Sequence, residues 1–401
     1  MSSLSPASSR ENEKEEAGAA SPKAAFRGVS DPGPGDRRAI GRFGFIIHPL
    51  SVSEDVGRKY PIARYLPARV VEWALKRMPP MMVGHVTGIV GNDGARAEGW
   101  LVGCPLTPRQ MLQLDEGYVI GRIIETGKAA QQAGARIVGL GAFTSVVGDA
   151  GISIARGLDI AVTTGNTYTV ATAIEGTLKA AQLMGLDPQQ STAAVVGCTG
   201  SIGGVTSQIL AEVVPRLILV GRDERKLRAV RERVSGRAQV EESTDPATAL
   251  LAADMVVTVT SAVDTVIEPR FLKAGAVVCD VARPRDVSKR VAQQRPDVLV
   301  IEGGVVAVPG EVDFGFDFGF PPRTAYACMS ETMILALEGR YESYSLGREI
   351  EEPKVREMTA LAAKHNFKLA GFRSFERQVS DEQINRTREL AERARKRGRG
   401  R

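Results

Sequence analysis

Short apolar runs alternate with amphipathic segments through the second half of the chain. Runs at 193–196, 217–220, 255–259, 276–279 and 298–301 are the predicted strands. Helical periodicity between them is clearest over 202–213 and 224–234. Strands that alternate with helices are typical of a doubly wound parallel sheet, whose ligands bind at the carboxyl ends of the strands.

The first half of the chain has a mixed pattern. After a head rich in Ser, Ala, Gly and Pro comes the apolar run 42–48. Stretches 83–90 and 97–102 are strand-like, and Gly91-Asn-Asp-Gly94 between them predicts a hairpin turn. Helices are expected over 116–133 and 167–184. This half is predicted to be a mixed α/β domain.

Beyond residue 301 the sheet pattern ends. A Phe/Gly stretch at 313–320 leads to Pro321-Pro322, which predicts a helix over about 323–339, followed by further helical segments. The expected fold class is α/β: a Rossmann-type doubly wound parallel sheet with a preceding mixed α/β substrate domain and C-terminal helices. The expected divisions are a disordered N-terminal segment (1–40), the substrate domain (41–186), an NADP-binding Rossmann domain (187–308), a C-terminal helical region (309–375) and a charged, basic tail (376–401).

A glycine-rich loop lies between the first strand of this repeat and its helix, in Val195-Val-Gly-Cys-Thr-Gly-Ser-Ile-Gly203. Its three glycines suit a tight turn, close approach of a pyrophosphate, and close packing of helix on sheet. The free amides of the helix N-terminus favour the same anion. The predicted cofactor-binding residues here are Gly197, Thr199, Gly200, Ser201, Ile202 and Gly203. A purely structural glycine loop is the alternative.

The residues after the second strand bear on cofactor choice. Arg222 stands where an acid would bind the ribose of NAD, and Lys226 follows one helical turn later, which favours the extra phosphate of NADP. Asp223 argues the other way, as an acid displaced by one position. Thr260 and Ser261, after the strand at 255–259, are expected near the nicotinamide. The predicted cofactor is therefore NADP(H).

Charge and composition restrict the class of protein. The chain has 401 residues, with 43% hydrophobic and 25% charged, and no apolar run long enough to cross a bilayer, so a soluble cytoplasmic protein is expected. The net charge is +5, but residues 384–401 alone carry +6. A solvated tail whose removal leaves stability unchanged is expected, with no specific nucleic-acid partner, and contact with a membrane surface stays open.

Four cysteines, Cys104, Cys198, Cys279 and Cys328, form no CxxC pair, and with three histidines they predict no metal site. Cys328 would lie about one and a half turns into the helix predicted after Pro322, where a helix N-terminus can lower a thiol pKa. A packed core cysteine is the alternative. Cys104 is a second candidate nucleophile, and His48 is either a proton donor or a structural histidine.

Several strings resemble the cyanobacterial long-chain acyl-[acyl-carrier-protein] reductases, over about 43–365. The strings are Phe43-Gly-Phe-Ile-Ile-His48, Leu140-Gly-Ala-Phe-Thr-Ser145, Thr163-Thr-Gly-Asn-Thr-Tyr168, the 197–203 loop, Gly303-Gly-Val-Val306 and Ala325-Tyr-Ala-Cys-Met-Ser-Glu-Thr332. The head, the Phe/Gly stretch, the tail and Cys279-Asp-Val-Ala-Arg-Pro-Arg-Asp286 depart from that pattern.

The resemblance implies an NADPH-dependent oxidoreductase that converts acyl thioesters of acyl carrier protein or coenzyme A to fatty aldehydes. It implies that Cys328 accepts the acyl group. In such an enzyme the side chains of the Phe/Gly stretch, which lies outside the resemblance, either line an acyl channel or pack into the core: Phe314, Phe316, Phe318 and Phe320. Two alternatives remain: a shikimate- or amino-acid-type NADP dehydrogenase with no covalent step, and a non-catalytic NADP-binding scaffold. The oligomeric state is not predicted.

Overall fold

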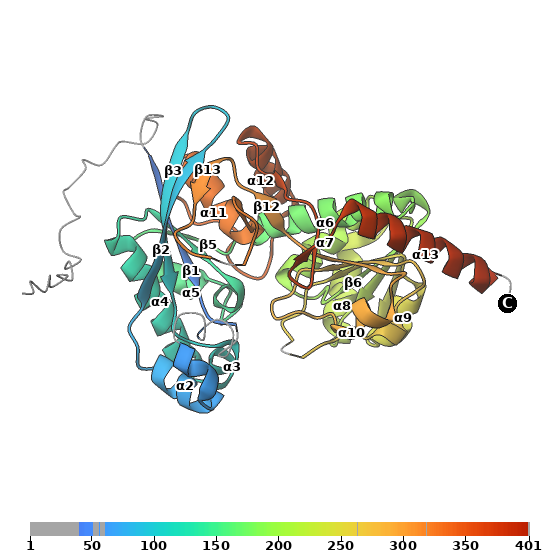
Figure 1. The fold of residues 1–401 in the computed structure, drawn as a ribbon, viewed down its shortest axis with the longest axis horizontal. Coiled ribbons are helices and arrows are strands. Elements are labelled where there is room, and N and C mark those ends of the chain that lie inside the picture. The colour runs from blue at the N-terminus through green and yellow to red at the C-terminus, as the bar shows by residue number, and fades with distance from the viewer. Residues whose placement is uncertain (1–39, 51–55, 57–60, 263, 318, 400–401) are drawn as a thin grey trace, which may run out of the picture. The chain divides into compact units, whose positions relative to one another are not determined.

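The computed structural model describes residues 40–50, 56, 61–262, 264–317 and 319–399. Two six-stranded sheets organise this part of the chain (Figure 1). The expected disordered head lies outside the described residues up to residue 39.

The first sheet is mixed, with the strand order β13-β2-β3-β1-β4-β5. β1 pairs in parallel with β3 and β4, and β2 pairs antiparallel with β3. The predicted hairpin at 91–94 is confirmed. The strands are β1 (Gly41–Ile47), β2 (Met81–Val90), β3 (Arg96–Gly103), β4 (Ile137–Leu140), β5 (Ala161–Thr163) and β13 (Gly310–Asp313).

Helices cover both faces of the first sheet, because β1 is apolar on both sides. Phe43 and Phe45 pack with α11 (Ala327–Leu337) in one apolar cluster, and Ile46 packs with α4 (Glu116–Gln132) in another. Alternate side chains of a strand point to opposite faces. The shorter helices of the half that contains the first sheet are α2 (Ala68–Leu75), α3 (Pro108–Gln113), α5 (Ile152–Arg156) and the 3₁₀-helices η2 (Pro61–Tyr65) and η3 (Ala142–Ser145).

The second sheet is all-parallel, with the order β11-β10-β9-β6-β7-β8, which confirms the predicted Rossmann-type fold class. Its strands are β6 (Thr192–Val196), β7 (Arg216–Val220), β8 (Gln239–Ser243), β9 (Met255–Thr258), β10 (Val277–Asp280) and β11 (Leu299–Glu302). The sequence pattern missed β8, an edge strand of polar composition. The helices of this half are α6 (Asn166–Leu183), α7 (Ser201–Leu210), α8 (Glu224–Val234), α9 (Pro246–Ala252), α10 (Arg290–Gln294) and α12 (Glu352–Lys364), with 3₁₀-helices η4 (Pro188–Gln190) and η5 (Pro269–Phe271).

The predicted helix over 323–339 is wrong at its start. Thr324–Tyr326 forms a strand, β14, which pairs antiparallel with β12 (Val305–Ala307), so α11 begins only at Ala327. Backbone pairing with β12 therefore outweighs the helix-start signal of the two prolines. The remaining short strands are β15 (Lys368–Leu369), β16 (Arg373–Ser374) and β17 (Arg377–Gln378).

The expectation of a solvated tail is also wrong. Residues 381–399 form helix α13 (Asp381–Arg399), and Ile384 and Ala391 are buried in the apolar cluster beneath the parallel sheet. The guanidinium of Arg395 donates to the Gly275 carbonyl at 2.7 Å. Two apolar side chains at helical spacing give this charged helix a packing face, which its average composition conceals.

Candidate functional site

A cavity of about 1250 Å³ lies between the carboxyl ends of the parallel strands and the first sheet. It brings together residues that are far apart in the sequence. The predicted site residues in its wall are Cys328, Cys104, His48, Gly197, Thr199, Gly200, Ser201, Ile202, Arg222, Lys226, Thr260 and Ser261. Gly203 lies behind the loop and outside this wall.

The glycine loop has the geometry that a dinucleotide requires. Gly197 has φ +84°, and a Cβ on Gly203 would lie 2.2 Å from the Gly197 carbonyl oxygen, so only glycine fits. At Gly200 the nearest atom to an added Cβ is 3.4 Å away, and this side of the loop faces the cavity. The loop then opens α7, whose first backbone N–H groups have no partner within the helix and would favour an anion bound there.

The residues after β7 take different roles. Arg222 and Lys226 are exposed in the cavity wall. Asp223 is the N-cap of α8, and its carboxylate accepts the backbone N–H groups of Arg225 at 2.9 Å and Lys226 at 3.2 Å. Both bonds end on Oδ1 of Asp223, and Asp223 is not one of the residues that line the cavity, unlike Arg222 and Lys226.

A buried carboxylate that the sequence analysis did not single out fixes the loop after β9. Asp286 is fully buried and accepts the Thr258 hydroxyl, the Thr260 hydroxyl and the Thr260 N–H, the last at 3.0 Å. Burial raises the pKa of Asp286, and these three donors oppose the shift. Thr260 is thus held by Asp286, while Ser261 is exposed in the cavity wall.

Cys328 is the second residue of α11 and is partly exposed in the cavity. Gly165, with φ +72°, packs against it so closely that an added Cβ would lie 2.4 Å from the Cys328 Cβ. The expectation of a lowered pKa is wrong: burial raises the pKa of the Cys328 thiol to about 12, although the Met329 N–H lowers it. Desolvation outweighs the helix N-terminus, and the nearby Glu331 carboxylate adds to the rise.

Glu331, one turn along α11, is a second functional candidate that the sequence analysis did not single out. Its fully buried carboxylate accepts the Tyr168 N–H at 2.9 Å and the hydroxyls of Thr163, Thr167 and Ser345. These contacts fasten α11 to the start of α6, and with it the position of Cys328. The closeness of the Thr163–Tyr168 and Ala325–Thr332 strings in the structure was not evident from either string alone.

His48 and Cys104 lie in the wall near the first sheet. The Phe143 N–H donates to Nε2 of His48 at 3.1 Å, so that nitrogen carries no proton, and Nδ1 lies 3.3 Å from the Pro49 carbonyl oxygen. His48 therefore acts as an acceptor at Nε2. Cys104 is fully buried, and burial raises its pKa to about 11, against a hydrogen bond from Thr126.

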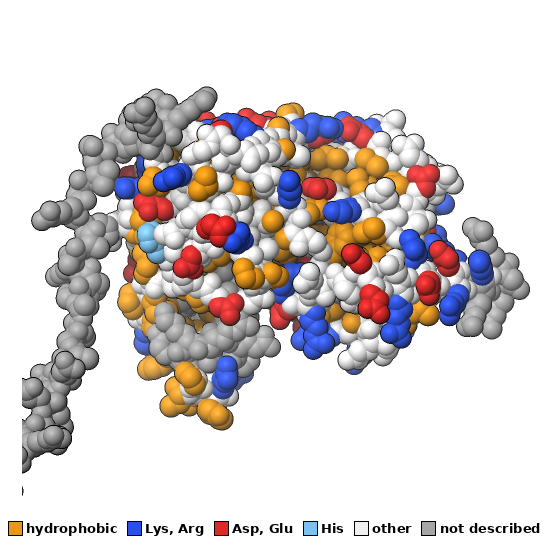
Figure 2. Space-filling model, turned by 45° about the horizontal axis from the view of Figure 1, so that its top comes forward, with side chains coloured by type: hydrophobic (Ala, Val, Ile, Leu, Met, Phe, Trp, Pro, Cys, Tyr) orange, Lys and Arg blue, Asp and Glu red, His pale blue; other side chains and the backbone are white. Residues whose placement is uncertain are grey.

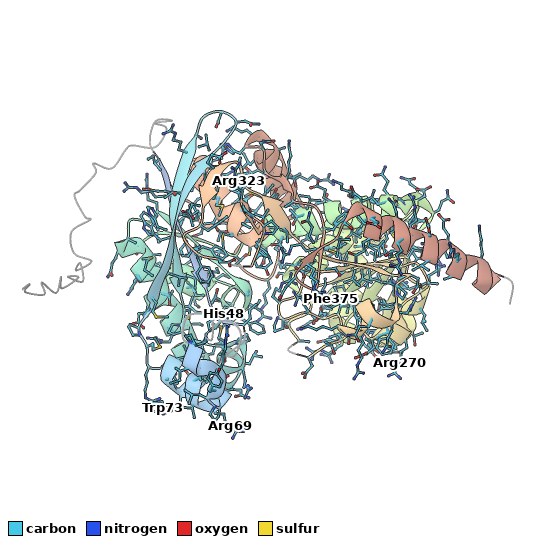
Figure 3. The ribbon with its side chains drawn as sticks, viewed as in Figure 1. His48, Arg69, Trp73, Arg270, Arg323 and Phe375 are labelled. Carbon is cyan, nitrogen blue, oxygen red and sulfur yellow. The ribbon has the colours of Figure 1, made fainter. Side chains whose placement is uncertain are left out.

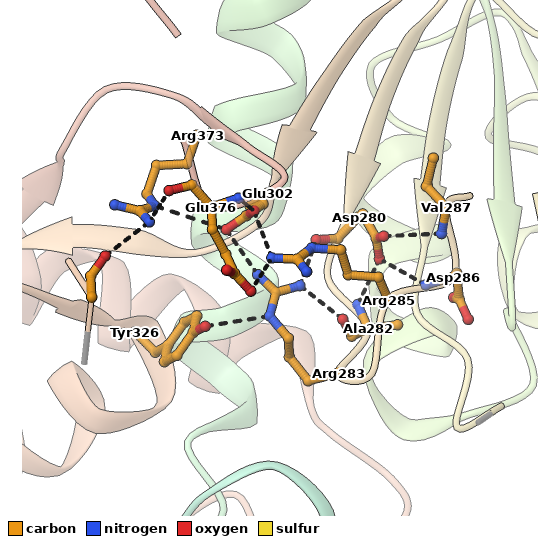
Figure 4. A network of polar contacts seen from close by, with 11 residues as sticks. Asp280, Ala282, Arg283, Arg285, Asp286, Val287, Glu302, Tyr326, Arg373 and Glu376 are labelled. Carbon is orange, nitrogen blue, oxygen red and sulfur yellow. Dashed lines mark hydrogen bonds and ion pairs between the residues drawn. The ribbon is translucent and has the colours of Figure 1, made fainter. Parts of the chain in front are cut away.

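A polar network joins the ends of β10 and β11 to the residue that precedes α11 (Figure 4). Glu302 binds Arg283 at 3.2 Å and Arg285 at 3.0 Å, and Arg283 Nε lies 3.4 Å from the Tyr326 hydroxyl. Burial lowers the pKa of Arg283, but Tyr326, Glu302 and Asp280 together raise it. The network keeps Arg283 charged and holds Tyr326, the N-cap of α11, against the parallel sheet.

The rest of the cavity wall is mainly apolar. Its side chains come from the first sheet, α2, η3 with the residue after it, and the Phe/Gly stretch: Phe45, Ile47, Leu75, Met81, Val83, Phe143, Val146, Phe316 and Phe320. Phe314 is buried in the core, whereas Phe316 and Phe320 line the cavity, so the two alternatives for this stretch each hold for part of it. Phe318 lies outside the described residues.

Residues 179–302 match the family described as shikimate / quinate 5-dehydrogenase. Aminotransferase PigE of Serratia is 30% identical over 86% of this chain, which spans only 41% of the length of that relative. The long-chain acyl-[acyl-carrier-protein] reductase of Synechococcus elongatus is 28% identical over 81% of this chain and 98% of its own. Among solved structures, L-tryptophan dehydrogenase from Nostoc punctiforme has a TM-score of 0.40 and 13% identity, and covers 88% of both chains.

The parallel sheet, its glycine loop and the family match identify a shikimate dehydrogenase-like NAD(P)-binding Rossmann domain. The family match is confined to residues 179–302, and the similarity of the chain to both curated relatives is distant. In the described part of the chain, no helix is long and apolar enough to span a membrane, and no group of three or more His, Cys, Asp or Glu side chains is placed to hold a metal ion.

Proposed function

We propose that this protein is an NADPH-dependent reductase that converts long-chain acyl thioesters to fatty aldehydes through a thioester on Cys328. One observation carries the proposal: a single cavity joins the dinucleotide loop, a partly exposed thiol and an apolar wall. A hydride donor, a nucleophile and a site for an alkyl chain are the parts that such a reaction needs.

The preference for NADPH is supported by charge. Arg222 and Lys226 present two cations at the end of β7, where the ribose of the adenosine half would lie. Asp223, the one acid that argued for NAD, is used as the cap of α8. Bound in this cavity, NADPH would supply the hydride that the reduction requires.

The covalent step uses residues of this chain alone. The Cys328 sulfur gives up its proton and attacks the thioester carbonyl carbon, forming a new C–S bond. The C–S bond to the carrier then breaks, and the carrier thiolate leaves and takes up a proton. Exchange of one thioester for another is nearly balanced in free energy, so the step needs no oxidant or reductant.

The negative charge that develops on the carbonyl oxygen needs donors. Cys328 and Met329 lie in the first turn of α11, where backbone N–H groups have no partner within the helix. Nε2 of His48 is not a donor to this oxygen in the arrangement found, because it accepts the Phe143 N–H. We therefore assign the stabilisation to the first turn of α11.

The carrier of the acyl group is proposed from the relatives. The name of the Synechococcus relative specifies an acyl-carrier-protein thioester, whereas PigE is named an aminotransferase. The apolar wall suits the alkyl chain, and acyl carrier protein or coenzyme A would hold the thioester end outside the cavity.

Intact mass after incubation with palmitoyl-coenzyme A, or with palmitoyl acyl carrier protein, tests the proposal. An acyl adduct that is absent in Cys328→Ser and disappears on addition of NADPH, with release of hexadecanal, is expected. Because burial raises the pKa of Cys328, adduct formation should accelerate about tenfold per pH unit between pH 7 and 9.

A simple dehydrogenase without a covalent step is the second candidate, favoured by the match of residues 179–302 to shikimate / quinate 5-dehydrogenase. It predicts no adduct under any of these conditions and oxidation of a hydroxy or amino acid with NADP⁺. NADPH binding without turnover of either substrate class would leave the non-catalytic scaffold.

A further inference from the structure

The segment η2–α2, residues 61–77, covers part of the cavity with one face. Ala63, Val71 and Leu75 are buried in a small apolar cluster of their own, and Leu75 also lines the cavity. This inner face accounts for three of the apolar side chains of the segment. The opposite face is apolar as well.

The outer face exposes five large apolar side chains within twelve residues. Their exposed fractions are 70% for Ile62, 87% for Tyr65, 43% for Leu66, 48% for Val70 and 60% for Trp73. Figure 2 shows the hydrophobic patch at this tip, and Figure 3 shows Trp73 and Arg69 directed away from the body of the protein. A helix that is apolar on both faces needs a partner for the second one.

Among residues 61–77, the exposed charged side chains all carry the same sign. Arg64, Arg69 and Arg77 are exposed, and Arg77 lies 4.0 Å from the Trp73 ring centroid. The one acid of residues 61–77, Glu72, is buried on the inner face, where it accepts the Thr107 hydroxyl at 2.9 Å. The partner of the outer face is therefore expected to be anionic.

We propose that the outer face of η2–α2 binds the surface of an anionic lipid bilayer. Tyr65 and Trp73 have apolar rings with a polar tip, which suits the boundary between headgroups and acyl chains, and the guanidinium groups suit anionic headgroups. A second copy of the chain fits less well, because a twofold contact would bring Arg64, Arg69 and Arg77 of both copies together.

The outer face lies on the segment that also borders the cavity, so lipid binding would extend the proposed function. The same segment separates the apolar cavity wall from the outer face, so lipid docking would put the cavity beside a reservoir for long alkyl chains. Binding to lipid is a property of the surface itself and requires neither NADPH nor a thioester.

Co-sedimentation of the full chain with vesicles of phosphatidylglycerol and phosphatidylcholine, 1:1, measures the binding directly. We expect binding to these vesicles, at least about tenfold weaker binding to phosphatidylcholine alone, and weakening by salt. Trp73→Ala and Arg69→Glu should each reduce the bound fraction several-fold. Both side chains are exposed, so folding should be preserved, and circular dichroism checks this.

Fluorescence gives a second measurement. The chain has two tryptophans, and in Trp100→Phe the emission comes from Trp73 alone, so anionic vesicles should shift it to the blue. The matched control is Lys396→Glu, which removes an exposed cation from the basic helix α13 and should bind as the unmodified chain does.

Three outcomes would overturn the proposal. Loss of binding in Lys396→Glu with none in Arg69→Glu would assign the lipid contact to α13. A blue shift of Trp73 emission with an acidic carrier protein, but not with vesicles, would make the face a protein-docking site. A dimer that forms without lipid and depends on Trp73 would make it a contact between two copies of the chain. Each readout is independent of aldehyde formation, so failure here leaves the proposed function standing, and the reverse also holds.

Discussion

The two six-stranded sheets differ in whether their strands come from one stretch of the chain or from distant segments. The parallel sheet is built from one continuous stretch, β6 to β11, and its cofactor loop closes on itself between Gly197 and Gly203. The first sheet takes β1 to β5 from the N-terminal half but adds β13 and is covered by α11, which follow the parallel sheet in sequence.

The two ends of the cavity are therefore held in place by different kinds of contact. The dinucleotide end depends on contacts between neighbours in sequence. The thiol end depends on packing between α11 and the start of α6, through Gly165 against Cys328 and the buried Glu331 carboxylate. Substitutions at the two ends should therefore separate cofactor binding from acyl chemistry.

The largest effect is expected at the thiol end. Cys328→Ser should lower aldehyde formation by roughly a hundredfold or more, because a hydroxyl ionises far less than a thiol, while NADPH binding persists. Turnover with palmitoyl-coenzyme A and NADPH fluorescence measure the two properties. Cys104→Ser is the matched control and should keep most of its activity. Normal turnover in Cys328→Ser with none in Cys104→Ser would move the nucleophile to the first sheet.

Gly165→Ala should disrupt the junction between the two halves. The new Cβ would lie 2.3 Å from the Cys328 Cα at a φ of +72°, so a loss of about 2–4 kcal/mol in the free energy of unfolding is expected. Gly121→Ala, with no atom within 4 Å of its added Cβ in helix α4, should be neutral or slightly stabilising. Urea denaturation compares the two, and equal stability of both variants would contradict the packing.

Ile384→Ala tests whether α13 belongs to the parallel-sheet half. Ile384 is buried in its apolar cluster, so removal of three carbons should cost about 2–3 kcal/mol and lower the melting temperature. Lys396→Ala, on the exposed side of the same helix, should change stability by less than about 0.5 kcal/mol. An unchanged melting temperature in Ile384→Ala would restore the idea of a solvated tail.

The smallest effect in this series concerns the cofactor end alone. Arg222→Ala should weaken NADPH binding by roughly tenfold to a hundredfold, about 1.5–3 kcal/mol, because a charge-assisted contact to the 2′-phosphate is lost. NADH affinity and the rate of adduct formation at Cys328 should hardly change. Titration of both cofactors by fluorescence decides the matter, since equal losses for NADPH and NADH would remove the preference for NADP.

The parallel sheet and the loop at Gly197–Gly203 could be predicted from the sequence, because glycine spacing and strand–helix alternation are local features of one stretch of chain. The sequence pattern does not predict β8, whose edge position allows a polar composition. It does single out Cys328, but it places the start of the helix that carries this residue too early in the chain.

The remaining features of the site depend on tertiary packing. Tertiary contacts pair β14 with β12, partly bury Cys328 beside Glu331 and pack α13 through Ile384. Each of these depends on contacts between segments far apart in the chain or on desolvation, and the free energy of burial is a property of the assembled surroundings, which no local pattern contains.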